Sequence, residues 1–380
     1  MPSKAMVKSR RATGPPCVGD DRGPQHVKKK ASLAKGAKGD EKAAAQQLCG
    51  ALQRNSRPVP AESLDCGGVL YYNNNYRQSI MHDPSLREEN TMARHILENE
   101  FLKITVADAG AELISVWDKT ANQERIWTGE PEVWNRHAPI LFPFVGKVKD
   151  GKYRIGDKEY AMKTQHGFAR DQEFVCVEKT DISVTHCLTA TEQTRNIYPY
   201  EFRLTVCHKL LPGKELAIEW TIENPGEEKM FFSIGGHPGF MMPEGTRKED
   251  CLISFPGKTA LQYISANAAG YILPQKKTLP LSNGLAAWQA DIPDTWIFED
   301  HQVQSVGIAR PDGTPFVSLH CDMFPMLAVW ANPNGPFICL EPWFGRADDE
   351  GFTGTIDQKK DMQALNAGAK KDIAYCIEFH

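Results

Sequence analysis

Glu341 is the first residue whose type and setting point to chemistry. The apolar run at 337–340 leads directly to this carboxylate, and Pro342 and Trp343 follow it. A carboxylate buried among apolar residues is costly unless it is paired or used. Partial desolvation would raise its pKa toward neutrality, which suits a general base. The alternative is a structural salt bridge, for example to Arg346, and for Glu341 taken alone that alternative is the preferred interpretation.

Two histidines lie in comparable turns. His237 stands in the stretch 231–240 (FFSIGGHPGF), and His166 stands in 165–170 (QHGFAR). The glycines beside them let the backbone bend sharply and leave space next to each ring. A histidine titrates near neutral pH, so it can lend a proton and take it back. For either residue alone, a core histidine bonded to a carbonyl is the simpler interpretation.

A histidine and a glutamate set against aromatic residues form a candidate acid/base pair. Proton-shuttling isomerisation needs one acid and one base, and neither a metal nor a nucleophile. Glycoside hydrolysis would instead need two carboxylates, and Asp294 is a candidate for the second. The flat apolar side of Trp343 offers a surface on which a sugar ring can stack.

Motifs for cofactor chemistry are absent from the sequence. The stretch 257–259 (GKT) is like the end of a P-loop, but Leu252 occupies the position of its first glycine. There is no GxGxxG before a helix, no HExxH and no GxSxG. In 320–322 (HCD), strand alternation would separate His320 from Cys321. We therefore expect neither a cofactor nor a metal.

The elements that must position these residues follow a period of two. Apolar and polar side chains alternate at 202–207, 215–223 and 373–379, and turn signals such as 150–151 (DG) and 332–335 (NPNG) separate the runs. Alternation of this kind is typical of antiparallel sheets with one buried face. The sequence predicts an all-β sandwich, with one short helix near residues 361–369.

Residues 1–91 differ from the rest of the chain. They contain no Trp and no Phe, and their 15 Lys and Arg exceed their 9 Asp and Glu by 6. Such a segment has little to bury, so it is expected to be a disordered basic extension. An alternative is that Met92 is the natural start and that 1–91 result from start-site assignment. The globular domain is predicted to span 92–380.

The whole-chain averages exclude several classes of protein. The 380 residues carry a formal net charge of −4, so no general attraction to nucleic acid is expected. No apolar run approaches the roughly 20 residues of a membrane span, so no membrane association is expected. The ten cysteines are scattered without a CxxC pair, and we expect reduced thiols and a cytoplasmic location.

From about His95 to His380 the sequence resembles the aldose 1-epimerase (galactose mutarotase) superfamily, and within it the bacterial LacX-like branch. Five ordered segments carry the resemblance: 138–143 (APILFP), 165–170 (QHGFAR), 236–240 (GHPGF), 294–295 (DT) and 339–343 (CLEPW). The resemblance implies a large antiparallel β-sandwich of the galactose mutarotase type, called a supersandwich. It also implies interconversion of the α and β anomers of a free aldose, with a small sugar as the partner molecule.

The resemblance assigns roles to individual residues. It implies that Glu341 is the base for the C1 hydroxyl, that His237 is the acid for the ring oxygen, and that His166 holds the sugar. Asp294 would bind sugar hydroxyls, and Lys147 or Lys149 would stand where galactose mutarotases carry a substrate-binding arginine.

Other functions remain open at this point. A hexose-6-phosphate 1-epimerase would need a cluster of cations, for which Arg170, Arg136 and Arg346 are available. A non-catalytic sugar-binding protein is a second alternative, and nucleic-acid binding through the basic extension is a third. The sequence does not indicate the oligomeric state.

Overall fold

The computed structural model describes residues 93–288 and 295–380, and strands dominate both stretches. The predictions for residues 1–91, and for Met92 as a start, concern residues outside the described part. Helices in the described residues are short. They are the α-helix α3 (Glu192–Ile197) and the 3₁₀ helices η2 (Lys149–Gly151), η3 (Ala169–Asp171), η4 (Lys248–Asp250) and η5 (Ile356–Gln358). Among these helices, none is long and apolar enough to cross a membrane.

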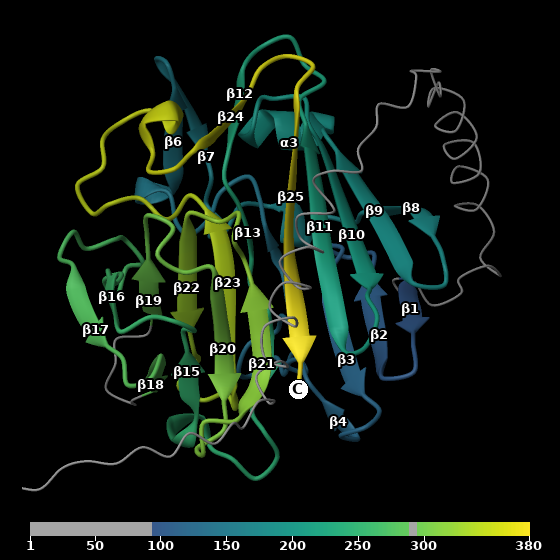
Figure 1. Ribbon diagram of the computed structural model, residues 1–380. Helices are drawn as coiled ribbons and strands as arrows, with labels where there is room; N and C mark the ends of the chain where they lie inside the picture. Colours follow the sequence, from purple (N-terminus) through teal and green to yellow (C-terminus); the bar gives the residue numbers. More distant parts are fainter. Residues whose placement is uncertain (1–92, 289–294) are drawn as a thin grey trace, which may run out of the picture. The chain divides into compact units, whose positions relative to one another are not determined.

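A nine-stranded antiparallel sheet runs across the structure (Figure 1). Its strands, in spatial order, are β18 (Leu285–Ala287), β15 (Leu252–Ser254), β20 (Ser305–Ala309), β21 (Pro315–His320), β25 (Lys370–Phe379), β11 (Glu215–Glu223), β10 (Arg203–Leu210), β9 (Ser183–Thr189) and β8 (Val175–Lys179).

Two further sheets cover its buried face. The six-stranded sheet contains β19 (Thr295–Phe298), β22 (Met326–Trp330), β23 (Phe337–Phe344), β13 (Ile234–Gly236) and β5 (Ile140–Leu141) in that order, with β14 (Gly239–Met241) also paired to β23. The four-stranded sheet contains β1 (Arg94–Glu98), β2 (Leu102–Ala107), β3 (Leu113–Asp118) and β4 (Gln123–Glu124).

Three two-stranded sheets complete the described strands. They are β6 (Lys152–Ile155) with β7 (Lys158–Ala161), β12 (Met230–Phe232) with β24 (Gln363–Leu365), and β16 (Ala260–Tyr263) with β17 (Lys277–Pro280). Every strand pair in the sheets is antiparallel. The predicted all-β antiparallel sandwich is therefore confirmed.

The core follows the alternation read from the sequence. In the ladder between β11 and β25, Leu216 lies opposite Ile377 and Trp220 lies opposite Ile373, and all four are buried. One hydrophobic cluster joins these side chains to Ile104 of β2 and to others of β23. Each fully buried side chain of this size contributes about 1.5–3 kcal/mol, so the packing of the sheets fixes the strands that carry the site.

One expected element is wrong. The short helix expected near residues 361–369 is replaced by strand β24, where Leu365 is buried opposite Met230 of β12. Asp361 has φ 51°, a left-handed conformation that a right-handed helix does not tolerate. The α-helix that does form, α3, begins at a capping box between Thr191 and Thr194.

Candidate active site

Strand β23 carries Glu341 through the middle of the six-stranded sheet. Every residue of β23 is buried. On one side of the strand, Glu341 pairs with Ala328 of β22, whose methyl group leaves room beside the carboxylate. On the other side, β13 and β14 pair with β23 in one continuous register, Gly235 opposite Trp343 and Gly239 opposite Cys339. His237 lies in the gap between these two strands, and this register brings it opposite Glu341.

Glu341 and His237 form a close buried pair. Oε2 of Glu341 lies 3.2 Å from Nε2 of His237, and the two residues are 1% and 7% exposed. Burial raises the pKa of Glu341 well above its usual range. Burial, aided by the guanidinium of Arg170, lowers the pKa of His237 to about 3. At pH values between the pKa of His237 and the pKa of Glu341, the two side chains together hold one proton. Burial places this proton on the carboxyl group of Glu341.

Several polar atoms at this pair are unsatisfied. Among the described residues, Oε2 of Glu341, Nδ1 of His237 and Nε1 of Trp343 are buried and have no well-formed hydrogen bond. The indole N–H of Trp343 is near enough to oppose the rise in the pKa of Glu341, although it is not aligned as a hydrogen-bond donor. Buried polar groups are normally paired, so three such atoms together indicate a place where a polar ligand completes the bonding.

His166 is held in one orientation by its own backbone. Its Nδ1 accepts a hydrogen bond from the N–H of Gly146 at 3.0 Å, and its own N–H donates to the carbonyl of Gly146. Nδ1 therefore carries no proton, so the neutral ring is protonated at Nε2. The side-chain amide of Gln165 lies 2.8 Å from Nε2 and, with its oxygen turned toward the ring, accepts that proton. Burial, together with His237 and Arg170, lowers the pKa of His166 well below its usual range. His166 is thus a fixed neutral donor whose ring centre lies 5.5 Å from that of His237.

The turn that holds His166 requires an unusual backbone. His166 has φ 67° and Gly167 has φ 70°. A side chain at Gly167 would meet the carbonyl oxygen of Phe142 at 2.3 Å, so only glycine fits there. Strain of this kind is commonly found at functional sites.

Aromatic rings enclose the histidine. Trp134 lies 4.9 Å from the ring of His237 at an interplanar angle of 33°, and Trp330 lies 5.5 Å away at 77°. Trp134 also stacks on Phe337 of β23 at 5.3 Å. These rings exclude water from the imidazole and account for the burial that lowers its pKa.

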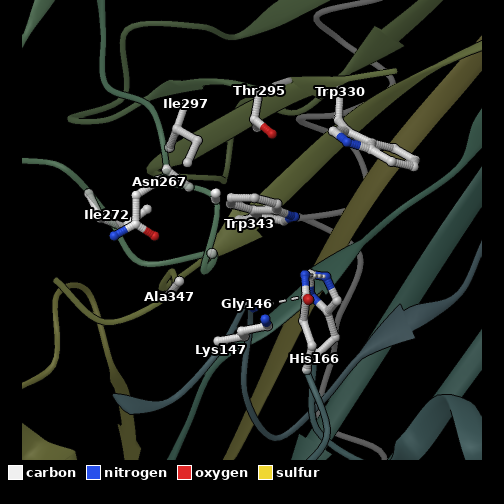
Figure 2. Close-up of a pocket in the computed structure, with 14 residues that line it drawn as sticks. Gly146, Lys147, His166, Asn267, Ile272, Thr295, Ile297, Trp330, Trp343 and Ala347 are labelled. Atoms are coloured by element: carbon white, nitrogen blue, oxygen red, sulfur yellow. Dashed lines mark hydrogen bonds between the residues drawn. The ribbon is translucent and has the colours of Figure 1, made fainter. Parts of the chain in front are cut away.

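A cavity of about 240 Å³ opens beside the pair. Its lining residues include His166, Lys147, Trp330, Trp343, Asn267 and Thr295. Figure 2 shows His166 and Lys147 on one side of Trp343, and Thr295 and Trp330 on the other. Glu341 and His237 are not among the lining residues. Two of the lining residues, His166 and Trp330, contact the ring of His237.

The structure separates the other predicted site residues. Lys147 lines the cavity and donates from Nζ to the carbonyl of Ala269 at 3.0 Å, whereas the Nζ of Lys149 pairs with Asp150. Arg170 does not line the cavity, and its guanidinium donates to the carbonyl of Gln165 at 2.7 Å. Asp294 lies outside the described residues.

The salt bridge considered for Glu341 is not formed. Arg346 instead contacts Glu299 at 2.8 Å and Asp349 at 2.9 Å. Arg346 therefore has two carboxylate partners of its own, and among the described residues the ionisable neighbours of Glu341 are His237 and Cys339.

Three residues near the site, Trp134, Asn267 and Trp330, were not predicted from the sequence, whereas Thr295 lies in the segment 294–295 that carries the family resemblance. Trp330 had a weak signal, since it ends an apolar strand just before the turn at 332–335. The turn expected after Glu341 is not formed, because Pro342 and Trp343 continue strand β23. Trp134 and Asn267 lie in loops, where no periodicity marks a residue. Both come to the site only through contacts far along the chain.

Two groups of side chains in the described residues are spaced closely enough to hold a metal ion. One is His237 with Cys339 and Glu341, and the other is His95 with Cys176 and His186. In each group the donor atoms lie within 4.8 Å of one another. In the first group, burial and the neighbouring Glu341 raise the pKa of the Cys339 thiol, so it is protonated beside the acid/base pair.

Comparison with known proteins agrees with this fold. Residues 94–279 match the family model described as aldose 1-epimerase. The chromosomal LacX protein of Lactococcus lactis subsp. lactis is 30% identical over 261 residues, which cover 66% of this chain and 87% of that protein.

Solved structures give the same result. A galactose mutarotase related enzyme from Lactobacillus acidophilus is 30% identical, with a TM-score of 0.71 over 76% of this chain and 97% of its own. A galactose mutarotase-like protein from Lactobacillus casei is 31% identical, with a TM-score of 0.71 over 76% of this chain and 100% of its own. The chain therefore belongs to the aldose 1-epimerase superfamily, in its LacX-like branch.

Proposed function

We propose that this protein is an aldose 1-epimerase that interconverts the α and β anomers of a free aldose by general acid/base catalysis. The observation that carries the proposal is the 3.2 Å contact between the buried Glu341 and His237 beside a cavity of about 240 Å³. That volume lies just below the ~300–1,000 Å³ of sites for drug-sized ligands, which suits a monosaccharide.

The geometry of the pair fits the chemistry of an anomeric centre. The C1 hydroxyl oxygen and the ring oxygen of an aldose are both bonded to C1. An acid for one and a base for the other must therefore stand side by side, as Glu341 and His237 do. Glu341 takes the proton of the C1 hydroxyl while His237 gives a proton to the ring oxygen. The C1–O bond of the ring then breaks and the aldehyde forms.

The return step uses the same two groups. Rotation about C1–C2 turns the other face of the aldehyde toward the former ring hydroxyl. His237 takes the proton from that hydroxyl as it attacks C1, and Glu341 returns a proton to the carbonyl oxygen. The pair holds one proton before and after the reaction, so no exchange with water is required.

Sugar binding must also bring Glu341 and His237 into the protonation state that reacts. Burial favours the state in which Glu341 is protonated and His237 is neutral. The reactive state has the proton on His237 instead. The hydroxyl groups of a bound sugar, together with the N–H of Trp343, supply hydrogen bonds that the ionised carboxylate lacks. His166 is a donor at Nε2, and a sugar oxygen at this end of the cavity binds it by taking the place of the Gln165 amide, which lies 2.8 Å from that nitrogen.

The alternative of a phosphorylated substrate receives less support. A phosphate dianion needs free cations close together. Arg136 is paired with Asp171, Arg346 with Glu299 and Asp349, and Arg170 with a backbone carbonyl. Lys147 alone contributes a cationic side chain to the cavity lining. A binding protein without activity would not need a buried acid and base in contact.

The test is a measurement of anomer exchange by NMR with the full chain. Glucose, galactose and common pentoses are compared with glucose 6-phosphate and galactose 6-phosphate. We expect exchange of at least one free aldose to accelerate well above the solvent rate, with no gain from phosphorylation. Acceleration of phosphorylated sugars alone would support the alternative enzyme. Sugar binding without acceleration would support the binding protein.

A further inference from the structure

A second cluster of ionisable side chains lies where the edges of two sheets meet. His95 comes from β1, the edge strand of the four-stranded sheet, and Asp108 follows β2. Cys176 and His186 come from β8 and β9 at one edge of the nine-stranded sheet. Figure 1 shows β1, β8 and β9 at the same end of the structure. We call these four residues the edge cluster, and the proposed sugar chemistry uses none of them.

Asp108 holds both imidazoles of the edge cluster. Its Oδ1 lies 2.7 Å from Nε2 of His95 and 3.0 Å from Nε2 of His186. The carboxylate accepts from both rings, so both Nε2 atoms carry the hydrogen. The lone pair of each neutral ring is then at Nδ1. The two rings meet edge to face, with centres 5.1 Å apart.

The thiol stands next to these rings. Cys176 is directly opposite His186 in the ladder between β8 and β9. Its Sγ, one ring nitrogen of His95 and one of His186 all lie within 4.8 Å of one another. His186 is completely buried, and among the described residues its Nδ1 has no hydrogen-bond partner. A buried acceptor without a partner is costly, and a bound cation would satisfy it.

The arrangement matches a common device of metalloproteins. A metal-binding histidine usually donates its other ring N–H to a carboxylate, which fixes the orientation of the ring and makes it a better ligand. Two imidazoles and one thiolate favour Zn²⁺ over the oxygen-seeking Mg²⁺ and Ca²⁺. Zinc sites with three protein ligands leave a fourth position for water. The side chains of His95 and Asp108 are 17% and 16% exposed, so solvent can reach the fourth position of a metal bound in the edge cluster.

We propose that the edge cluster is a zinc site in which His95, His186 and Cys176 are the ligands and Asp108 orients the two histidines. Binding releases the thiol proton of Cys176 to solvent and forms a bond from its sulfur to the metal. The ion links β1 to β8 and β9, and so joins the edges of the two sheets.

The first test is metal binding by the full chain. Zn²⁺ affinity is measured by competition with a chromophoric chelator, and Co²⁺ serves as a spectroscopic probe because a thiolate ligand gives it a charge-transfer band. Removing a carboxylate that only orients a ligand costs about 10–100-fold in affinity. We therefore expect Asp108→Asn to weaken Zn²⁺ binding by about that factor. Cys176→Ser and His95→Gln should weaken it further, and Cys176→Ser should abolish the thiolate band.

Matched controls isolate the site from other ligands in the chain. Cys207→Ser changes another partly buried thiol of the same sheet, on β10, and His320→Gln changes an exposed histidine on β21. Both should bind Zn²⁺ and Co²⁺ as the wild type does. Residues 1–91 contain Cys17, Cys49, Cys66, His26 and His82, so the result is the difference between each variant and the wild type.

Two outcomes would overturn the proposal. One is a Co²⁺ thiolate band that persists in Cys176→Ser, which would place the metal elsewhere, for example at Cys339. The other is equal Zn²⁺ affinity in the wild type, Cys176→Ser and His95→Gln, which would leave the edge cluster as a hydrogen-bonded network only. Circular dichroism of each variant shows whether it is folded. The partly exposed His95 provides the variant least able to disturb the core.

Discussion

The acid/base pair and the edge cluster use the same side chains in different ways. Each combines histidine, a carboxylate and cysteine within a few ångströms. At the pair, one carboxylate faces one imidazole, so a single proton is shared and can move between them. In the edge cluster, one carboxylate accepts from two imidazoles, so its protons are fixed and the rings are held in place.

The surroundings reinforce this difference. Glu341 lies in the middle of a fully buried strand beside a cavity, with tryptophans around its histidine partner. Asp108 follows β2, next to the edge strand β1, and is partly exposed. Burial moves the pKa values of Glu341 and His237 in opposite directions, so the shared proton stays on the carboxyl group until a bound sugar stabilises the ionised carboxylate. The edge cluster is built for holding its rings in one geometry. The comparison predicts that the pair contributes turnover and that the edge cluster contributes stability.

The largest expected effect is on turnover. Glu341→Gln keeps the shape of the side chain and removes the base, and losing one positioned acid or base typically costs about 10²–10⁴ in rate. Polarimetry on the sugar found active with the wild type measures the loss. The control is Asp108→Asn, which should keep the wild-type rate. Loss of turnover in the control with full turnover in Glu341→Gln would reverse the comparison.

A double variant tests whether the pair acts as one unit. Groups that work together in one proton transfer give strongly non-additive losses. We expect Glu341→Gln combined with His237→Asn to be no more than about tenfold slower than the slower single variant. Multiplication of the two single losses, measured by the same polarimetry, would mean that the residues act independently.

Much of the fold could be predicted from the sequence, and less of the site. The runs with a period of two identified the strands that have one buried face, because buried and exposed residues alternate along such a strand. The expected separation of His320 from Cys321 is found as well, since His320 is exposed and Cys321 is buried. The helix expected near 361–369 failed because the pairing of Leu365 with Met230 depends on a partner more than a hundred positions away.

The site illustrates the same limit. The motifs around Glu341 and His237 singled out the residues, but only the shared register of β13, β14 and β23 brings them into contact. The edge cluster gave no sequence signal at all, since its residues come from four separate places along the chain. Contacts between distant strands are set by packing, which a local pattern does not contain.

The third prediction concerns stability at the edge cluster. Asp108→Asn removes the charge that both imidazoles share, while its backbone bonds to Ala93 and Phe174 can remain. The ring of His186 is completely buried, and removing its charged acceptor costs about 1–3 kcal/mol in the free energy of unfolding. Urea denaturation with excess chelator measures it without a metal contribution. No change in unfolding free energy, with or without Zn²⁺, would show that the carboxylate does not hold the rings.

Over a single pH unit, the smallest effect is the pH dependence of stability at the pair. Burial raises the pKa of Glu341 above its ordinary 4.5, so above that pH the unfolded chain releases a proton that the native protein keeps. Its contribution to stability is therefore lost as pH rises through the folded pKa.

His237 has the opposite sign. Its pKa is lowered from 6.5 to about 3, so its contribution is present above pH 6.5 and is lost as pH falls through the folded pKa. That contribution is common to the wild type and Glu341→Gln, so the difference between the two proteins isolates the carboxyl group. From pH 5 to pH 8 we expect the difference in unfolding free energy to move in favour of Glu341→Gln, by at most about 1.4 kcal/mol per pH unit.

Urea denaturation of both proteins at several pH values measures this slope. Glu341→Gln, which has lost its turnover, should therefore gain stability relative to the wild type as pH rises. Asp108→Asn, in contrast, should lose stability relative to the wild type. A difference that stays constant with pH would mean that Glu341 ionises as readily in the native protein as in the unfolded chain. That result would contradict the sharing of one proton between Glu341 and His237.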